Sequence, residues 1–424
     1  MTTVAAELIE RTTAARAAAR ALAKLPTEAK NRALLAIAES LEKQQADVIA
    51  ANNIDLAAGR QAGLAESLLD RLMLNRERLV GMAKDVRSVA ALPDPVGEAY
   101  DARTLPNGLR IERRRVPLGV IGVIYEARPN VTTDIVSLCL KSGNAVVLRG
   151  GKEAFNSNQA LVKLIRMALA NFGVTPEIVQ FVTSTDRAIV EQMVKLDEHI
   201  DLLIPRGGIN LIKFVREEAT MPAITGGIGV VHAFVDATAD EKKAVEIIHN
   251  SKVQRPSVCN ALDTMLIHAS AAPRLLQPIA RRLIGAGVEL RCDQRAISLL
   301  GPIDERHVKA AAPDDFGQEF LALVMSVRVV DSMSEAIEHI ERHGSGHTET
   351  IVTEDYTNAM RFLDEVDAAV VEVNASTRFN DGGQLGLGAE VAISTNKLHA
   401  RGPMGLRELT SYKWIVLGDG QVRP

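Results

Sequence analysis

The polar turn around Cys259 holds the residues best suited to covalent chemistry, because it places a thiol between two predicted regular elements. A stretch with helical spacing, 240–249, precedes it, and an apolar, strand-like stretch, 262–267, follows it. Functional side chains tend to lie in such irregular connections. Lys252 and Arg255 are close in sequence, and positive charge near a thiol favours the thiolate, which is the nucleophilic form. We therefore interpret Cys259 as a nucleophile.

The other two cysteines have settings typical of inert thiols. Cys139 lies in the stretch 131–140, where apolar residues recur at helical spacing and predict a position in the core. Cys292 has acidic Asp293 as its neighbour, and negative charge disfavours a thiolate. A small buried thiol is the commoner state of any single cysteine. The contrast with these two residues is what favours Cys259 as the reactive thiol.

Two glycine pairs indicate a second kind of chemistry, the binding of phosphate. Arg149-Gly150-Gly151-Lys152 and Arg206-Gly207-Gly208 each follow a predicted strand and precede a predicted helix. Each joins a cation to backbone that can approach a phosphate closely, ahead of a partly positive helix N-terminus. Neither matches a Walker loop or the GxGxxG pattern, and glycine also serves plain turns. Their repetition among alternating strands and helices favours a nucleotide site.

Composition excludes several other classes of protein. The chain has 424 residues and a net charge of -4, and apolar residues make up 47%, the balance of an ordinary soluble protein. This charge offers no basic surface for nucleic acid or for an anionic membrane. No stretch reaches the roughly 20 apolar residues that span a bilayer, and the N-terminus lacks the layout of a signal peptide. We expect a cytoplasmic protein.

Neither a disulfide framework nor a metal site is predicted. The three cysteines are widely spaced without a CxxC pair, which fits a reducing compartment. His343 and His347 are four residues apart, but Gly344-Ser345-Gly346 between them interrupts the helix that a pair of metal ligands would need.

The order of predicted elements indicates an α/β protein. Residues 2–92 are rich in helix-forming residues and predict three helices. Strands alternate with helices between 145 and 235, and a second alternating series runs from 262 to 373. Alternation of this kind builds parallel sheets that bind ligands at the carboxyl ends of their strands. Examples of the predicted elements are strands 145–148 and 200–204 and helices 209–218 and 272–284.

Two extended segments lie outside the alternating series. Residues 110–126 are rich in β-branched side chains, with Pro117 and Gly119 marking an edge or a bulge. Residues 414–417 predict a terminal strand that could pair with a partner subunit. The triplet Arg113-Arg114-Arg115 could bind an anion, but an edge strand guarded by charge is the commoner explanation, and we favour it.

Several long strings of residues resemble one enzyme family. They are Gln254-Arg255-Pro256-Ser257-Val258-Cys259-Asn260-Ala261, Gly344-Ser345-Gly346-His347-Thr348-Glu349, Val373-Asn374-Ala375-Ser376-Thr377-Arg378-Phe379, and the segments 386–390 and 397–405. The strings resemble the gamma-glutamyl phosphate reductases of the aldehyde dehydrogenase superfamily, and the resemblance spans nearly the whole chain.

The resemblance implies a fold and its division. A Rossmann-type nucleotide domain is expected with an α/β catalytic domain and a small β oligomerisation segment. The NADPH-binding domain with its N-terminal helices would comprise 1–110 and 131–255, and the catalytic domain 256–373. Residues 111–130 and 374–424 would form the oligomerisation and substrate-loop segments.

The resemblance also implies an activity. L-Glutamyl 5-phosphate would be reduced by NADPH to L-glutamate 5-semialdehyde, with release of phosphate, in proline biosynthesis. Cys259 would carry the acyl group as a thioester. A glutamate 5-kinase would supply the acyl phosphate, and the chain would form a homodimer or homotetramer.

Roles for further residues follow from the glycine pairs and from the resemblance. The expected cofactor contacts are Arg149, Lys152, Arg206, Gly207, Gly208, Gly226, Gly227 and Glu319. Lys152 stands where relatives carry an acid, and this change favours the 2′-phosphate of NADPH. Ala127 occupies the place of the usual oxyanion asparagine, so the Asn260 side chain or the Cys259 N–H would take over that role.

A substrate with a carboxylate and a phosphate requires a cationic pocket. The candidates are Arg378, Lys397 and Arg401, with Asn374 and Ser376 as hydrogen-bonding residues. Each of these residues could equally belong to an ordinary solvated surface.

Two rival functions stay open. Hydrolytic members of the superfamily have a glutamate just before the glycine pair that corresponds to Gly226-Gly227, where this chain has Ile224 and Thr225. Water then lacks a base that would activate it, which argues against an oxidising, water-using aldehyde dehydrogenase. The intact Cys259 turn argues against a non-catalytic nucleotide-binding module.

Overall fold

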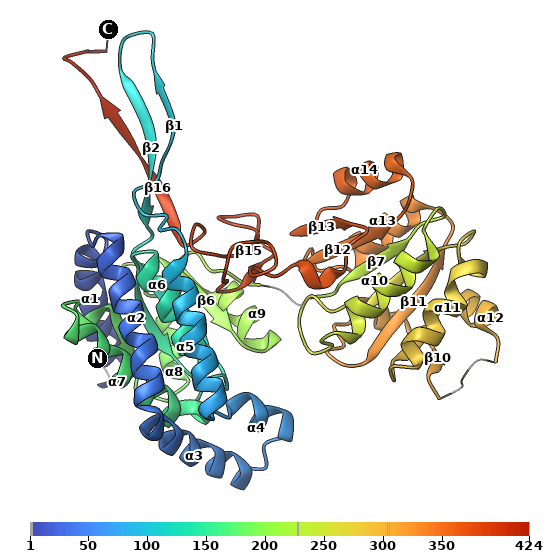
Figure 1. Cartoon of the computed structure of the whole chain (residues 1–424), viewed down its shortest axis with the longest axis horizontal. Helices are drawn as coiled ribbons and strands as arrows, with labels where there is room; N and C mark the ends of the chain where they lie inside the picture. Colours follow the sequence, from blue (N-terminus) through green and yellow to red (C-terminus); the bar gives the residue numbers. More distant parts are fainter. Residues whose placement is uncertain (1–2, 227–228, 303, 305, 424) are drawn as a thin grey trace. The chain divides into compact units, whose positions relative to one another are not determined.

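The computed structural model describes residues 3–226, 229–302, 304 and 306–423. The chain divides into two compact units, which we describe separately (Figure 1). The first unit comprises residues 1–225, 386–392 and 404–424, and the second comprises 226–385 and 393–403. These bounds differ from the sequence-based ones, which extended the nucleotide domain to residue 255 and assigned all of 374–424 to one segment.

Helices form the N-terminal part of the first unit. They are α1 (Thr3–Leu22), α2 (Thr27–Lys43), α3 (Gln45–Gln61), α4 (Glu66–Leu72) and α5 (Arg76–Ala91). Five helices thus replace the predicted three, because short breaks interrupt the helix-forming sequence. Pro26 precedes α2, and the Asn75 side chain accepts a hydrogen bond from Arg78 N (2.8 Å) to cap α5.

A parallel sheet forms the centre of the first unit. Its strands are β3 (Val120–Tyr125), β4 (Ala145–Arg149), β5 (Val179–Phe181) and β6 (Leu202–Arg206), in the order β5-β4-β3-β6. The strands alternate with helices α6 (Asn130–Lys141), α7 (Phe155–Asn171), α8 (Ala188–Met193) and α9 (Ile209–Glu218). All six residues of β3 are buried. Residues 120–125 therefore belong to the middle of this sheet and not to the expected oligomerisation segment.

A three-stranded antiparallel ribbon extends from the first unit (Figure 1). It contains β1 (Ala99–Thr104), β2 (Arg110–Pro117) and β16 (Thr410–Leu417), with β2 in the middle. The prediction of an edge strand for the arginine triplet was wrong, because β16 pairs with β2 along its whole length. Arg113 lies over the rings of Tyr412 and Trp414, at 4.8 and 4.7 Å from their centroids.

The second unit is built on a seven-stranded parallel sheet. The strands are β7 (His232–Val235), β8 (Thr264–His268), β9 (Glu289–Cys292), β10 (Val308–Ala310), β11 (Val324–Val330), β12 (Thr348–Val352) and β13 (Val370–Val373), in the order β10-β9-β11-β8-β7-β12-β13. Helices α10 (Glu241–Val253), α11 (Ala272–Ile284) and α12 (Gln294–Leu300) contribute to one apolar core. Helices α13 (Met333–His343) and α14 (Tyr356–Glu365) contribute to another. This alternation confirms the predicted α/β class.

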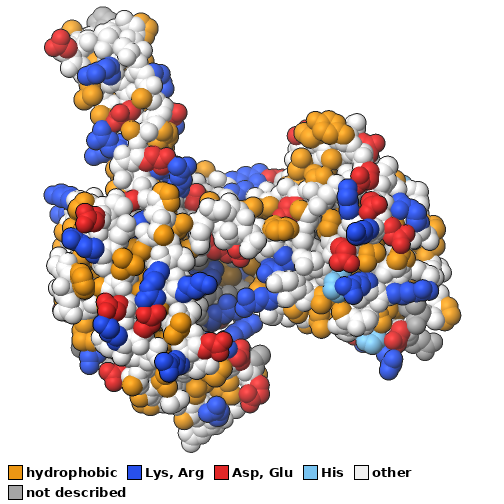
Figure 2. All heavy atoms as spheres, viewed as in Figure 1, with side chains coloured by type: hydrophobic (Ala, Val, Ile, Leu, Met, Phe, Trp, Pro, Cys, Tyr) orange, Lys and Arg blue, Asp and Glu red, His pale blue; other side chains and the backbone are white. Residues whose placement is uncertain are grey.

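No helix in the described ranges is long and apolar enough to cross a membrane. Figure 2 shows basic and acidic side chains interspersed over the visible face of each unit.

Two buried lysines connect the helices of the first unit. The Lys30 ammonium lies 2.5 Å from Asp94 Oδ2 and donates to the carbonyl of Lys141 (3.1 Å). The Lys141 ammonium donates to the carbonyl of Ala90 (2.8 Å). Both lysine side chains are almost fully buried, so each charge depends on these partners.

Lys30→Met should destabilise the chain by about 3 kcal/mol, because it leaves the buried Asp94 carboxylate without its cation. The measurement is urea unfolding followed by circular dichroism. Lys43→Met is the control, since Lys43 and Glu39 form an exposed pair one helical turn apart, for which a loss below about 0.5 kcal/mol is expected. Equal effects of the two substitutions would contradict this account of Lys30.

Candidate functional site

Cys259 lies in the turn between the end of α10 and the start of β8. Its side chain is half-buried, whereas Cys139 on α6 and Cys292 on β9 are buried. Burial raises the pKa of the Cys139 thiol, and burial together with Asp293 raises the pKa of Cys292 to about 12. Cys259 is therefore the cysteine best exposed to a reagent.

Hydrogen bonds from two directions hold the Cys259 turn. Thr377 Oγ1, in the short 3-10 helix η4 (Thr377–Phe379), donates to the carbonyl of Asn260 (2.7 Å). The Asn260 amide donates to the carbonyl of Asn380 (2.9 Å), and the Asn380 amide donates to Thr348 Oγ1 (2.7 Å). On the α10 side, Ser251 Oγ accepts from Thr377 N (3.2 Å). We call these hydrogen bonds the Cys259 clamp.

Gly229 packs closely against the backbone of the same turn. A Cβ at this position would overlap the carbonyl oxygen of Cys259, so only glycine allows the two backbones to lie this close. The Gly229 N–H donates to Glu319 Oε1 (3.2 Å). Burial raises the pKa of Glu319, and this hydrogen bond opposes the rise. The predicted cofactor residue Glu319 is thereby connected to the Cys259 turn through Gly229.

The other predicted glycines of this region are less informative. A Cβ on Gly226 would overlap the carbonyl oxygen of Ile393, so close packing accounts for glycine there. Gly227 lies outside the described residues.

Of the two cations close to Cys259 in the sequence, Lys252 is already paired with a carboxylate. Lys252 is buried beside Asp263, with 3.7 Å between Nζ and Oδ1. Burial lowers the pKa of Lys252 to about 8 and raises that of Asp263 to about 7.

Burial lowers the pKa of a third cation, Arg378, whereas Asp381 and a charged Cys259 raise it and Arg255 lowers it. The Arg378 Nε donates to Gln254 Oε1 (2.8 Å). A positive Arg378 and a negative Cys259 therefore stabilise each other, and Asp381 acts on the same guanidinium.

Ser376 supports the backbone next to Arg378. Its hydroxyl donates to Asn250 Oδ1 (2.7 Å) and lies 3.1 Å from Ser251 Oγ. It also accepts a hydrogen bond from Arg378 N (3.3 Å). These contacts join η4 to the last turn of α10, so Ser376 positions Arg378.

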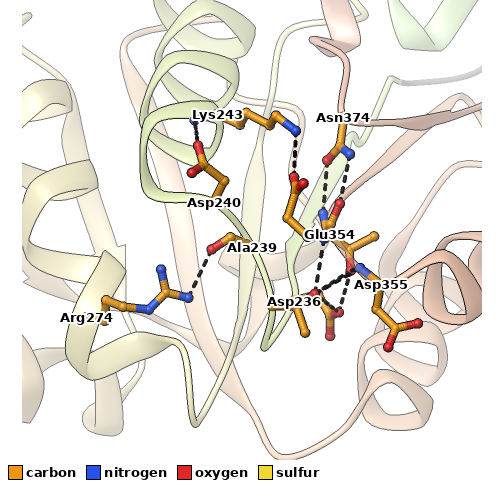
Figure 3. A network of polar contacts seen from close by, with 10 residues as sticks. Asp236, Ala239, Asp240, Lys243, Arg274, Glu354, Asp355 and Asn374 are labelled. Atoms are coloured by element: carbon orange, nitrogen blue, oxygen red, sulfur yellow. Dashed lines mark hydrogen bonds and ion pairs between the residues drawn. The ribbon is translucent and has the colours of Figure 1, made fainter.

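Asn374 lies at the carboxyl ends of β7, β12 and β13, within a polar network (Figure 3). Its side chain accepts from Thr353 N (3.0 Å) and donates to Thr353 O (2.8 Å). Asp236 in the same network accepts from Thr353 Oγ1 (2.7 Å) and Asn358 Nδ2 (3.0 Å). The Asn374 amide thus connects the carboxyl ends of β12 and β13. Cys259 precedes β8 and therefore lies at the opposite edge of the sheet, at the amino ends of the strands.

The two remaining predicted substrate cations share one partner. Lys397 Nζ lies 2.6 Å from Asp367 Oδ2, and Arg401 Nη1 lies 2.5 Å from Asp367 Oδ1. Both positive charges are therefore paired with this carboxylate, which is largely exposed.

The first nucleotide-type loop follows β4. Arg149 Nη2 donates to the carbonyl of Thr185 (3.1 Å), and burial lowers the pKa of Arg149. Lys152 is exposed and begins a short 3-10 helix, η1 (Lys152–Ala154). A Cβ on Gly150 would overlap the side-chain amide nitrogen of Asn158. This nitrogen is buried and has no hydrogen-bond partner in the described part of the chain. Glycine backbone beside a buried donor fits a cradle for a dinucleotide.

The second loop follows β6 and contacts Glu126, a residue that was not among the predicted site residues. Glu126, directly after β3, accepts a hydrogen bond from Gly208 N at the start of α9 (2.9 Å). Its own N–H donates to the carbonyl of Arg206 (3.1 Å). An acid one residue beyond a buried strand was the available signal, but its partner depends on how β3 and β6 pair.

Among residues 3–226, 229–302, 304 and 306–423, no group of three or more His, Cys, Asp or Glu side chains is arranged to hold a metal ion. His343 ends α13, and His347 is buried just before β12.

Comparison with known proteins gives consistent matches. The model of the aldehyde dehydrogenase family matches residues 2–304 and 315–415. The gamma-glutamyl phosphate reductase of Roseiflexus castenholzii is 58% identical over 413 residues, covering 96% of this chain and 97% of the relative. The protein of that name from Dehalococcoides mccartyi strain CBDB1 is 54% identical over 417 residues, covering 98% of each chain.

A solved structure agrees with these relatives. The crystal structure of gamma-glutamyl phosphate reductase from Thermotoga maritima superposes with a TM-score of 0.96 at 47% identity. The match covers 99% of this chain and 100% of the other. The fold expected from the sequence strings is confirmed, and the chain belongs to the aldehyde dehydrogenase family of oxidoreductases.

Proposed function

We propose that the chain reduces L-glutamyl 5-phosphate to L-glutamate 5-semialdehyde with NADPH and releases phosphate. The observation that carries this proposal is the clamped, half-buried Cys259 turn beside Arg378, in a chain more than half identical to proteins named gamma-glutamyl phosphate reductase. The step would serve proline biosynthesis in the cytoplasm, with a glutamate 5-kinase as the source of the acyl phosphate. A homodimer or homotetramer is part of the proposal.

Cys259 begins the reaction as a nucleophile. Its thiolate attacks the acyl carbon, a carbon–sulfur bond forms, and the carbon–oxygen bond to phosphate breaks with its electron pair leaving on phosphate. An acyl phosphate is already activated, so this step needs a nucleophile and oxyanion donors more than a strong base. The backbone N–H of Cys259 is the proposed oxyanion donor. Asn260 acts mainly as a positioning residue, because its amide already donates to Asn380.

The cofactor supplies hydride when bound, and the chain's own residues orient it. Arg149 and Lys152 would bind the 2′-phosphate of NADPH, and the amide of Gly208 at the start of α9 would bind its pyrophosphate. Glu319 would accept from a ribose hydroxyl, as its carboxylate also accepts from Gly229. Collapse of the thiohemiacetal on Cys259 would then release the aldehyde and restore the thiolate.

Arg378 is the proposed principal cation for the substrate. Its Nε donates to the neutral side chain of Gln254, and Asp381 and a charged Cys259 both raise the pKa of its guanidinium. Lys397 and Arg401 would have to share their charge with Asp367. Asn374 and Ser376 contribute by holding backbone in place.

A water-using aldehyde dehydrogenase is the weaker alternative. At the two positions before Gly226, Ile224 is an apolar side chain in the core and Thr225 is also buried. Neither side chain is a base that would activate water to cleave a thioester.

The reverse reaction tests the proposed function. The chain is mixed with L-glutamate 5-semialdehyde and NADP, with and without inorganic phosphate, and formation of NADPH is followed by absorbance. Reduction of NADP only when phosphate is present is the expected result. Equal rates without phosphate would show that water is the acceptor and would overturn the proposal.

Cys259→Ser should lower turnover by on the order of a thousandfold or more, because a serine hydroxyl remains protonated where the thiol ionises. Binding of NADPH should be unchanged in a fluorescence titration. Cys292→Ala is the matched control and should keep its turnover at a cost of about 1 kcal/mol in stability. Substantial turnover by the Cys259→Ser variant would exclude this residue as the nucleophile.

Arg378→Gln should raise KM for the aldehyde tenfold or more, since a charged hydrogen bond is worth about 1.5–3 kcal/mol. It should also slow alkylation of Cys259 by iodoacetamide at neutral pH, because the thiolate loses its cation. Arg295→Gln is the control, because Arg295 pairs with Asp331 on the surface of the second unit. An unchanged alkylation rate in Arg378→Gln would show that Arg378 does not act on the thiol.

A further inference from the structure

The carboxyl ends of β3 and β6 meet where the strand order of the first sheet reverses. The chain passes outward from β3 through β4 to β5 and then returns, so that β6 lies on the other side of β3. Open α/β sheets bind nucleotides in the crevice at such a reversal. The residues that fill this crevice therefore decide how a nucleotide enters it.

A carboxylate of the chain itself occupies this position. Glu126 Oε2 accepts from the N–H of Gly208 at 2.9 Å. A Cβ on Gly207 would lie 2.5 Å from the carboxyl carbon of Glu126 and 2.7 Å from its Oε1. Glycine at position 207 thus leaves room for the carboxylate. The backbone of Glu126 is held in place by a hydrogen bond from its N–H to the carbonyl of Arg206 (3.1 Å).

The backbone amide that Glu126 contacts lies at the N-terminus of helix α9. Gly208 is the N-cap residue of the ten-residue helix α9, and its position provides no side chain to cap the helix. The free N–H groups and the dipole at a helix N-terminus attract one anion strongly. Glu126 now serves as that anion, and a pyrophosphate bound to the same amide would take its place.

A second observation concerns the end of β4, which lies close to Glu126, since a Cβ on Gly151 would be 3.3 Å from the Cα of Glu126. Among the residues that the structure describes, none is a hydrogen-bond partner of the buried side-chain nitrogen of Asn158, which lies against Gly150 at the end of neighbouring β4. Its amide oxygen is already engaged, since Thr132 Oγ1 donates to it (3.0 Å) and also contacts the Tyr125 hydroxyl (2.6 Å). The oxygen of the Asn158 side chain has a partner and its nitrogen does not, so the nitrogen can donate a hydrogen bond to an acceptor atom of a ligand.

We propose that the Glu126 carboxylate competes with the cofactor pyrophosphate for the N-terminus of α9. It holds Gly208 N–H in the nucleotide-free chain and leaves it when NADPH binds. The inference rests on the proposed function for the identity of the nucleotide. When the oxidised cofactor departs, the carboxylate returns, so α9 has an anion at its N-terminus in both states. The apparent affinity for nucleotide is lowered by the fraction of chains in which Glu126 occupies the amide.

Binding to the full chain tests the proposal without turnover. NADPH is titrated by fluorescence and inorganic pyrophosphate by calorimetry, both at one fixed low ionic strength, with wild type, Glu126→Gln and Glu126→Ala. Both variants should bind both ligands more tightly, by on the order of tenfold for Glu126→Ala. The gain for Glu126→Gln should be smaller, because the glutamine oxygen can still accept from Gly208 and preserves the loop.

Glu217→Gln is the matched control, since it removes the same charge from the exposed end of the same helix. It should bind both ligands as wild type does. Equal or weaker binding by both Glu126 variants would overturn the proposal, and so would failure of every form to bind either ligand.

The outcome is separable from the test of the proposed function. Tighter binding in the Glu126 variants, together with turnover that ignores phosphate, would remove the proposed reaction and keep this inference. Phosphate-dependent turnover with unaltered binding in the Glu126 variants would do the reverse.

Discussion

The placement of Cys259 depends on the hydrogen bonds of the Cys259 clamp. A turn has no ladder of its own, so its buried backbone groups need partners from elsewhere. Thr377 supplies one for the carbonyl of Asn260, and Ser251 ties Thr377 to the end of α10. Gly229 closes the turn from another side, where any Cβ would overlap the Cys259 carbonyl. The thiol is therefore fixed by residues whose own side chains perform no chemistry.

The proposed site positions of the two units share one feature, because each has a charged side chain of the chain itself next to it. In the second unit the guanidinium of Arg378 acts on Cys259, while the buried Lys252 is neutralised by Asp263. In the first unit the Glu126 carboxylate occupies the start of α9. In the proposed mechanism, an anionic substrate or cofactor meets positions where an anion is already favoured, and its affinity reflects an exchange of partners more than the filling of an empty site.

Local patterns predicted much of this structure, and contacts between distant segments account for what was missed. Helices 209–218 and 272–284 were correct to the residue because their apolar spacing is regular. The buried strand β3 was included in the expected segment 111–130, because residues 110–126 were interpreted as one extended stretch in spite of Pro117 and Gly119. Lys252 is near Cys259 in sequence, yet spacing does not reveal which way the side chain at a helix end points. Arg378 was found through the resemblance of its string, and Glu126 was missed because its role requires the pairing of β3 with β6.

Mass spectrometry of the acyl-enzyme tests the central claim most directly, because covalent capture by Cys259 distinguishes this mechanism from any without a nucleophile. The chain is incubated without reduced cofactor in the presence of L-glutamyl 5-phosphate generated in place by a glutamate 5-kinase, then quenched in acid and digested. The account predicts a glutamyl group on the peptide that contains Cys259, and none on the peptides of Cys139 or Cys292. An acyl group on another residue, or no adduct from a preparation that turns over once NADPH is added, would contradict it.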